Sequence, residues 1–201
     1  MNIIHKRDSL PFIIIENTFD SDELRSIYSE LDYLQTKLQG PDNTSSAVDN
    51  NGVPLKKNTG IFLNTVYQDL TFSNIHNVTK KLFTRDMLNI YGRCHPTYNV
   101  INSPNLVYNT LISYYENLHY YKPHVDLSVM SMVSWFFKEP KNFTGGDFYF
   151  PDYDIVIPVR NNVTVIFFSC FKHAVSEIKM LDSSIPGSGR FTVSQFCTIY
   201  N

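Results

Sequence analysis

The sequence lacks the features that would assign it to a membrane or a nucleic-acid-binding class. Its 201 residues carry a formal net charge of only −2 at pH 7, with no long run of like charges. Nucleic acids and anionic membranes are bound largely through clustered positive charge, so we expect neither as a partner. No stretch approaches the roughly 18 consecutive apolar residues of a membrane span.

Cysteine and targeting signals are also scarce. The three cysteines, Cys94, Cys170 and Cys197, cannot all pair, so we expect free thiols in a reducing compartment. Residues 1–8 are polar and have no apolar core of signal-peptide length. We therefore expect a cytoplasmic protein. Phosphate-binding glycine patterns and nucleophile elbows are absent too, so neither chemistry is indicated.

Hydrophobic residues make up 43% of the chain, which is enough for the core of one domain spanning 1–201. In the first part, about 1–92, β-branched residues predict a strand at 11–17. Asp20 and Glu23 have the spacing of a capping box, and apolar residues at helical spacing follow until Gly40. We also expect a short strand at 61–67 and a second helix over 78–91. Residues 41–60 are polar and aperiodic, which fits either a solvated loop or a mobile lid over a substrate site.

The remainder, about 93–201, consists of short apolar or alternating segments separated by turn signals. Such segments predict strands, here at 106–115, 120–126, 128–137, 146–150, 154–159, 163–168 and 191–200. Many short strands after N-terminal helices indicate an α+β fold. We expect a double-stranded β-helix, that is, a jelly-roll or cupin-like barrel, supported by the N-terminal helices.

One short motif in this part has the residues of a metal site. His124 and Asp126 are separated by one residue, which in a strand places both side chains on one face, about 6–7 Å apart. His173 follows the apolar segment 163–168. Two imidazoles and one carboxylate on one face of a metal leave the opposite face open, as in the facial triad of non-haem Fe(II) oxygenases.

Four pieces of sequence, in order, resemble the Fe(II)- and 2-oxoglutarate-dependent dioxygenases, particularly the prolyl-4-hydroxylase-like branch. The first is the Tyr-rich strand leading into Pro123-His124-Val125-Asp126. The second is the turn Gly145-Gly146-Asp147 before a strand, and the third is the apolar strand that leads to His173. The last is Gly189-Arg190-Phe191-Thr192. The resemblance covers about half of the chain.

The resemblance implies a reaction as well as a fold. His124, Asp126 and His173 would be the catalytic iron(II) ligands. The reaction would consume 2-oxoglutarate and O2 and release succinate and CO2. Ascorbate is a further candidate cofactor. Related halogenating enzymes have a small residue in place of the carboxylate, so Asp126 favours hydroxylation.

The resemblance also implies a fixed cation for the far carboxylate of 2-oxoglutarate. Arg190 offers a planar, bidentate partner, and Thr192 lies two residues on along the same strand face. Arg190 is further from His173 than the family pattern predicts, which leaves Lys179 as the alternative. Tyr115 or Tyr114 would supply a hydroxyl to the co-substrate pocket, and packing in the core is an alternative role for both.

Two classes of function fit these features, and the first has two alternative kinds of substrate. An oxygenase would hydroxylate an unactivated carbon, for which the resemblance favours a prolyl or other side chain in a peptide or protein. A free amino acid or another small metabolite is the alternative substrate. A non-catalytic metal-binding or sensing module with a cupin-like fold is the remaining class. Succinate release with candidate substrates separates them, and the sequence leaves the oligomeric state open.

Overall fold

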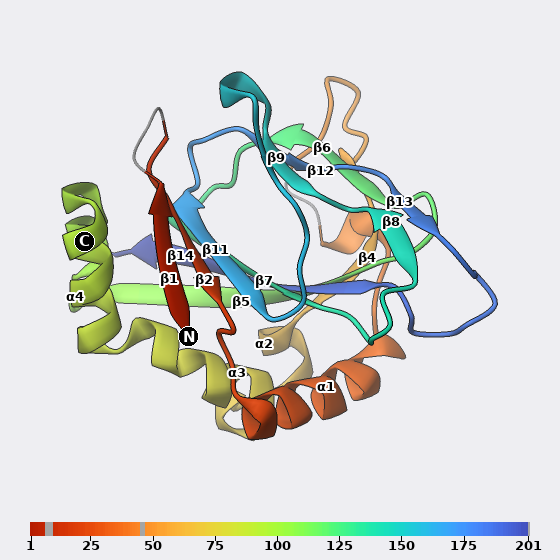
Figure 1. The fold of residues 1–201 in the computed structure, drawn as a ribbon, viewed down its shortest axis with the longest axis horizontal. Helices are drawn as coiled ribbons and strands as arrows, with labels where there is room; N and C mark the ends of the chain where they lie inside the picture. Colours follow the sequence, from red (N-terminus) through yellow and green to blue (C-terminus); the bar gives the residue numbers. More distant parts are fainter. Residues whose placement is uncertain (7–9, 45–46, 201) are drawn as a thin grey trace.

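The computed structural model describes residues 1–6, 10–44 and 47–200. Within these residues, the larger of two facing sheets has seven antiparallel strands in the order β1-β2-β11-β7-β14-β5-β4 (Figure 1). Its strands are β1 (Asn2–Lys6), β2 (Phe12–Glu16), β4 (Thr59–Phe62), β5 (Leu106–Tyr115), β7 (Met130–Phe136), β11 (Val163–Phe168) and β14 (Arg190–Ile199).

The second sheet lies over part of the first and has five strands in the described residues, in the order β10-β9-β12-β6-β3. A further pair, β13-β8, flanks it. The strands are β3 (Lys56–Lys57), β6 (Tyr120–His124), β8 (Phe143–Gly145), β9 (Phe148–Phe150), β10 (Ile155–Ile157), β12 (His173–Val175) and β13 (Ile178–Met180). The two facing antiparallel sheets form the predicted double-stranded β-helix.

Helices cover the outer face of the larger sheet (Figure 1). The longest, α1 (Ser21–Gln35), begins with the predicted capping box, in which the Asp20 carboxylate accepts from the backbone N–H of Glu23 while the Glu23 carboxylate accepts from that of Asp20. It ends at Gln35, before the predicted end at Gly40. Its apolar face is buried in the core at Ile27, Leu31 and Leu34.

Two predictions for the N-terminal part were wrong. The single helix expected over 78–91 is split into α3 (Asn74–Thr79), a short 3-10 turn and α4 (Arg85–Cys94). Thr84 has an extended backbone (φ −64°, ψ 151°) and so separates the two helices. The strand expected at 61–67 ends at Phe62 and continues as α2 (Leu63–Val66). Short apolar runs fit both periodicities, so the sequence alone did not distinguish them.

The N-terminal part also supplies strands, because β1, β2 and β4 belong to the larger sheet and β3 to the smaller one. None of the helices in the described ranges is long and apolar enough to cross a membrane. Among the described residues, no disulfide joins Cys94, Cys170 or Cys197.

Candidate metal and co-substrate site

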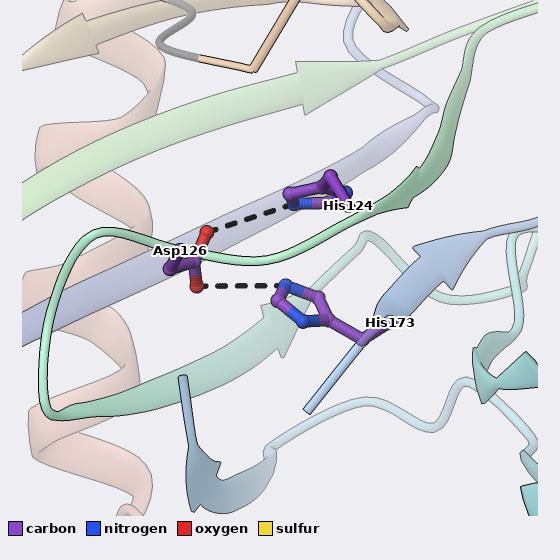
Figure 2. Close-up of side chains that lie close together, drawn as sticks. All are labelled: His124, Asp126 and His173. Atoms are coloured by element: carbon purple, nitrogen blue, oxygen red, sulfur yellow. Dashed lines mark ion pairs between the residues drawn. The ribbon is translucent and has the colours of Figure 1, made fainter. Parts of the chain in front are cut away.

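The three predicted metal ligands lie together between the two sheets (Figure 2). His124 is the last residue of β6 and His173 the first of β12, and the two are paired in the register of these neighbouring strands. Asp126 lies in the loop after β6 rather than on the strand, which corrects the expected strand at 120–126. Its backbone N–H donates to the Ser169 carbonyl at 3.1 Å, which holds the loop close to the end of β11.

The ligand atoms face one another at distances suited to one metal ion. The Nε2 atom of His124 lies 3.6 Å from Asp126 Oδ1, and that of His173 lies 3.5 Å from Asp126 Oδ2. One ligand atom from each residue lies within 4.8 Å of the others. Ligands about 2.1 Å from a metal and at right angles lie about 3 Å apart, so small shifts suffice for coordination.

Hydrogen bonds orient both imidazoles. The Nδ1 atom of His124 lies 2.8 Å from the Lys122 carbonyl oxygen, and that of His173 lies 2.9 Å from the Phe171 carbonyl oxygen. A carbonyl oxygen only accepts, so each Nδ1 carries the proton and each Nε2 presents a lone pair to the shared space. The two histidines thus use the same arrangement, a contact with the carbonyl two residues earlier.

Serine hydroxyls orient the carboxylate. Ser131 Oγ, on β7, donates to Asp126 Oδ2 at 2.5 Å. The same hydroxyl lies 2.8 Å from Ser169 Oγ, which lies 2.7 Å from Ser128 Oγ. This chain of hydroxyls fixes one carboxylate oxygen, a role that partners of metal ligands commonly have.

The protonation states of His173 and Asp126 fit a divalent cation. Burial lowers the pKa of His173 to about 4, so its imidazole is neutral at pH 7. Burial alone would raise the pKa of the Asp126 carboxyl, but the combined effect of His124, His173 and Ser131 is larger and opposite. The pKa therefore lies below its ordinary value. A neutral imidazole and an ionised carboxylate are the forms that bind metal.

The triad lies in a cavity of about 710 Å³ lined by both sheets. We call the part around His124, Asp126 and His173 the metal end. The anion end is the part around Arg190, Thr192 and Tyr115 of the larger sheet, and these three side chains also line the cavity. The site therefore spans the gap between the sheets.

Arg190 is fully buried at the start of β14. Its Nη1 donates to the Gly146 carbonyl, and its guanidinium carbon lies 4.3 Å from the centroid of the Tyr115 ring. Among the described residues, Nε and Nη2 of Arg190 have no hydrogen-bond partner. Burial lowers the pKa of Arg190 to about 10, against the opposing effect of Tyr115 and Asp147, so it is charged at pH 7. A buried cation with unpaired donors suits an anionic ligand.

The other predicted co-substrate residues fall into two groups. Thr192 Oγ1 is buried and has no partner among the described residues, and it lines the cavity with Arg190. Tyr114 points to the opposite face of β5, where its ring packs against Phe191 and its hydroxyl accepts from the Gly189 N–H at 3.1 Å. Lys179 is exposed on β13 and does not line the cavity.

The Gly145-Gly146-Asp147 turn has a structural role beside Arg190. Gly145 and Gly146 have φ values of +69° and +73°, which glycine adopts without strain. A Cβ on Gly145 would lie 2.1 Å from the Glu177 carbonyl oxygen. The turn presents the Gly146 carbonyl to Arg190, and Asp147 accepts from the Val159 N–H at 2.9 Å.

Nothing in the sequence indicated that two further residues, Ser131 and Lys56, belong to the site. Ser131 lies in a continuously buried strand, where alternation of apolar and polar residues is lost. Lys56 is buried in the cavity, although the segment 41–60 reads as a polar loop. Only the pairing of β3 with β6 brings Lys56 to the site.

No protein-family model and no curated protein sequence matches this chain. Solved structures do match. A prolyl-4-hydroxylase from Pseudomonas putida has a TM-score of 0.61 at 12% identity, with 96% of this chain and 95% of that chain covered. The viral collagen prolyl hydroxylase of Paramecium bursaria Chlorella virus-1, solved with 2-oxoglutarate, has a TM-score of 0.61 at 12% identity, with 94% and 96% covered. NgTET1, solved with 5mC DNA, has a TM-score of 0.51 at 14% identity, with 94% and 72% covered.

These similarities extend over almost the whole of this chain. At 12–14% identity they show a shared fold. The chain therefore has the double-stranded β-helix of the 2-oxoglutarate- and Fe(II)-dependent oxygenases, and its His-Asp-His cluster lies between the two sheets of that fold.

Proposed function

We propose that the protein is an Fe(II)- and 2-oxoglutarate-dependent oxygenase that hydroxylates an unactivated carbon. One observation carries the proposal: a single cavity contains both a facial His-Asp-His cluster and a fully buried arginine with unpaired donors. A metal-binding or sensing module needs only the first of these features. A buried guanidinium at the other end of the cavity is what a dicarboxylate co-substrate requires.

Each end has a defined task in this function. His124, Asp126 and His173 would hold iron(II) through two Nε2 atoms and a carboxylate oxygen. Arg190 and Thr192 would hold the far carboxylate of 2-oxoglutarate. When both are bound, they supply an oxidation in which O2 is consumed, 2-oxoglutarate becomes succinate and CO2, and a substrate C–H bond becomes C–OH. Ascorbate remains a candidate additive.

The side chains between the two ends exclude water. Trp135, Phe148 and Val175 line this part of the cavity from three different strands, and all are buried. Phe148 also stacks on the His173 ring, with centroids 5.4 Å apart. An apolar wall keeps the charged groups desolvated, so their interactions with a bound dicarboxylate are stronger than in water.

The proposed substrate is a prolyl or other side chain of a peptide or protein. The cavity continues along β5 and β14, where it is lined by Val107 and Asn109 of β5, by Phe196 and Thr198 of β14, and by Tyr200, which follows β14. Three of these five are exposed, namely Val107, Asn109 and Tyr200. An open, partly apolar extension suits an extended chain better than a free metabolite.

The second candidate is a free amino acid or another small metabolite, which the buried Lys56 favours because it offers a charge to a small acid. Nucleic acid lies outside the proposal, since the net charge is −2.

The test is succinate formation from 2-oxoglutarate by the full chain with Fe(II) and O2, with candidate peptides and free amino acids in turn. We expect succinate release that requires iron and rises with a true substrate, whose product gains the mass of one oxygen. An anaerobic sample is the control. Iron-independent succinate release, or none with any amount of iron, would contradict the proposal.

A further inference from the structure

Lys56 is a buried cation inside the cavity. It lies on β3, opposite Tyr121 of β6, and lines the cavity with His124 and Asp126. Its relative exposure is 3%, whereas its neighbour Lys57 is exposed. Lysine is rarely buried to this extent without a paired charge.

The Lys56 ammonium is only partly satisfied by the protein. Nζ donates to the Thr44 carbonyl at 2.9 Å and lies 5.7 Å from the centroid of the Tyr121 ring. Within residues 1–6, 10–44 and 47–200 it forms no ion pair with a carboxylate. An ammonium has three donors, so the carbonyl leaves two of them for another acceptor.

The two buried cations of the cavity occupy different places. Lys56 Nζ lies beside the Tyr121 ring, which stacks on the His124 imidazole with centroids 3.5 Å apart, whereas the Arg190 guanidinium lies over the Tyr115 ring. Lys56 therefore lies nearer to the metal end and Arg190 belongs to the anion end. With the far carboxylate of 2-oxoglutarate held by Arg190, the ammonium of Lys56 is left for a second anion.

We infer that Lys56 binds a carboxylate of the primary substrate and so selects substrates that carry one near the reacting carbon. This inference rests on the proposed function and narrows its substrate class. The carboxylate has two sources, the α-carboxylate of a free amino acid or an acidic residue beside the target in a peptide. A buried ammonium discriminates strongly against the neutral amide, because the amide would leave it without a counter-charge.

Matched probes separate these sources. One set is the twenty free L-amino acids and their α-amides. The other is a set of blocked peptides in which each candidate target residue is followed by Glu or by Gln. Iron-dependent succinate release by the full chain is measured with every probe, and binding of the same probes is measured by calorimetry with Zn(II) in place of iron.

Three variants then assign the preference to Lys56. In the wild type we expect the carboxylate member of one set to be favoured at least tenfold in kcat/KM and in Kd over its amide partner. In Lys56→Met the carboxylate and amide probes should be used and bound about equally, whereas Lys56→Arg should keep much of the preference for the carboxylate. Lys57→Met is the matched control on the same strand and should keep the ratio. A merely structural role would weaken both members of a pair equally and leave the ratio unchanged.

The outcomes keep this inference separate from the proposed function. Wild-type protein that releases succinate with iron but prefers no carboxylate probe in either set, or binds none, overturns the role of Lys56 alone. A carboxylate preference that survives in Lys56→Met overturns it as well. Wild-type protein without iron-dependent succinate release overturns the proposed function.

Discussion

At the metal end of the cavity the polar side chains are held by partners from the protein, whereas at the anion end most donors of Arg190 and Thr192 have none among the described residues. Each imidazole contacts a backbone carbonyl, and Asp126 accepts from Ser131. Arg190, by contrast, uses one nitrogen on the Gly146 carbonyl, and its other two nitrogens and Thr192 Oγ1 have no partner in the described residues.

This difference indicates how each end works. At the metal end, orientation is set in advance, so the free energy of metal binding is not spent on ordering the side chains. At the anion end, unpaired buried donors destabilise the protein until an anion fills the space. Substitutions at the two ends should therefore have different signatures.

The largest effect is expected at the metal end. Asp126→Ala removes the only carboxylate of the triad and leaves two imidazoles for a divalent cation. We expect iron-dependent succinate release to fall to background, and Fe(II) or Co(II) binding to be lost, with an unchanged circular dichroism spectrum. Asp152→Ala, an exposed carboxylate paired with Lys172, is the control and should behave as wild type. Full activity in Asp126→Ala would end the oxygenase proposal.

At the anion end, Arg190→Ala should weaken 2-oxoglutarate binding by about 2–4 kcal/mol, as for a charge-assisted bidentate pair. Metal affinity should stay nearly unchanged. Binding is followed by the fluorescence of Trp135, the single tryptophan, which lines the cavity. Lys179→Ala is the control and should have little effect. A large loss in Lys179→Ala with a silent Arg190→Ala would show that the co-substrate lies elsewhere.

A smaller effect separates orientation from coordination at the metal end. Ser131→Ala removes the hydroxyl that holds Asp126 Oδ2, so metal affinity should fall about 10–100-fold. Ser134 is a matched control on the same strand, because its hydroxyl is also buried but pairs with Thr164 at 2.7 Å. Ser134→Ala should cost similar stability without a change in metal affinity. Equal metal affinities of the two variants would show that Ser131 does not orient Asp126 for metal binding.

The smallest effect concerns the stability of the metal-free protein. Burial lowers the pKa of Lys56 from 10.5 to about 8, which corresponds to a cost of about 3 kcal/mol at pH 7. The hydrogen bond to Thr44 offsets about 2 kcal/mol. Lys56→Met should therefore stabilise the protein by about 1 kcal/mol at pH 7, measured by urea unfolding.

The pH dependence of this difference has a defined sign. Between about pH 8 and 10.5 the unfolded chain keeps the Lys56 proton that the folded protein has lost, so the wild type gains stability as pH rises through this window. The advantage of Lys56→Met should shrink there and then reverse. A difference that is independent of pH up to 10.5 would show that the ammonium is not desolvated.

The parts of the fold that the sequence predicted well are those with strong local patterns. The capping box at Asp20 marked the start of α1, and the long strands β5 and β11 were predicted with their observed bounds. The two- and three-residue strands β3, β8, β12 and β13 were missed, because they are too short to have a period and exist only through pairing with distant segments.

The residues of the candidate site also fall into those that local sequence patterns predicted and those that depended on strand pairing. The spacing of His124 and Asp126 pointed to the His-Asp-His cluster, and strand alternation placed Arg190 and Thr192 on one face of β14, where both line the cavity. The choice between Tyr114 and Tyr115 depended on strand register, which the sequence did not give. The position of Lys56 in the cavity depended on the pairing of β3 with β6, two strands that are far apart in the sequence.

The central claim is that one cavity binds a metal at one end and a carboxylate at the other. Three acids test it most directly by titration, without O2, into the protein with and without Fe(II). These are 2-oxoglutarate, 2-oxobutyrate, which lacks the far carboxylate, and glutarate, which lacks the keto group. We predict that 2-oxoglutarate binds tightest and only with iron, and that Arg190→Ala weakens 2-oxoglutarate and glutarate but not 2-oxobutyrate. Equal affinity for all three acids, or 2-oxoglutarate binding indifferent to both iron and Arg190, would contradict the two-ended site.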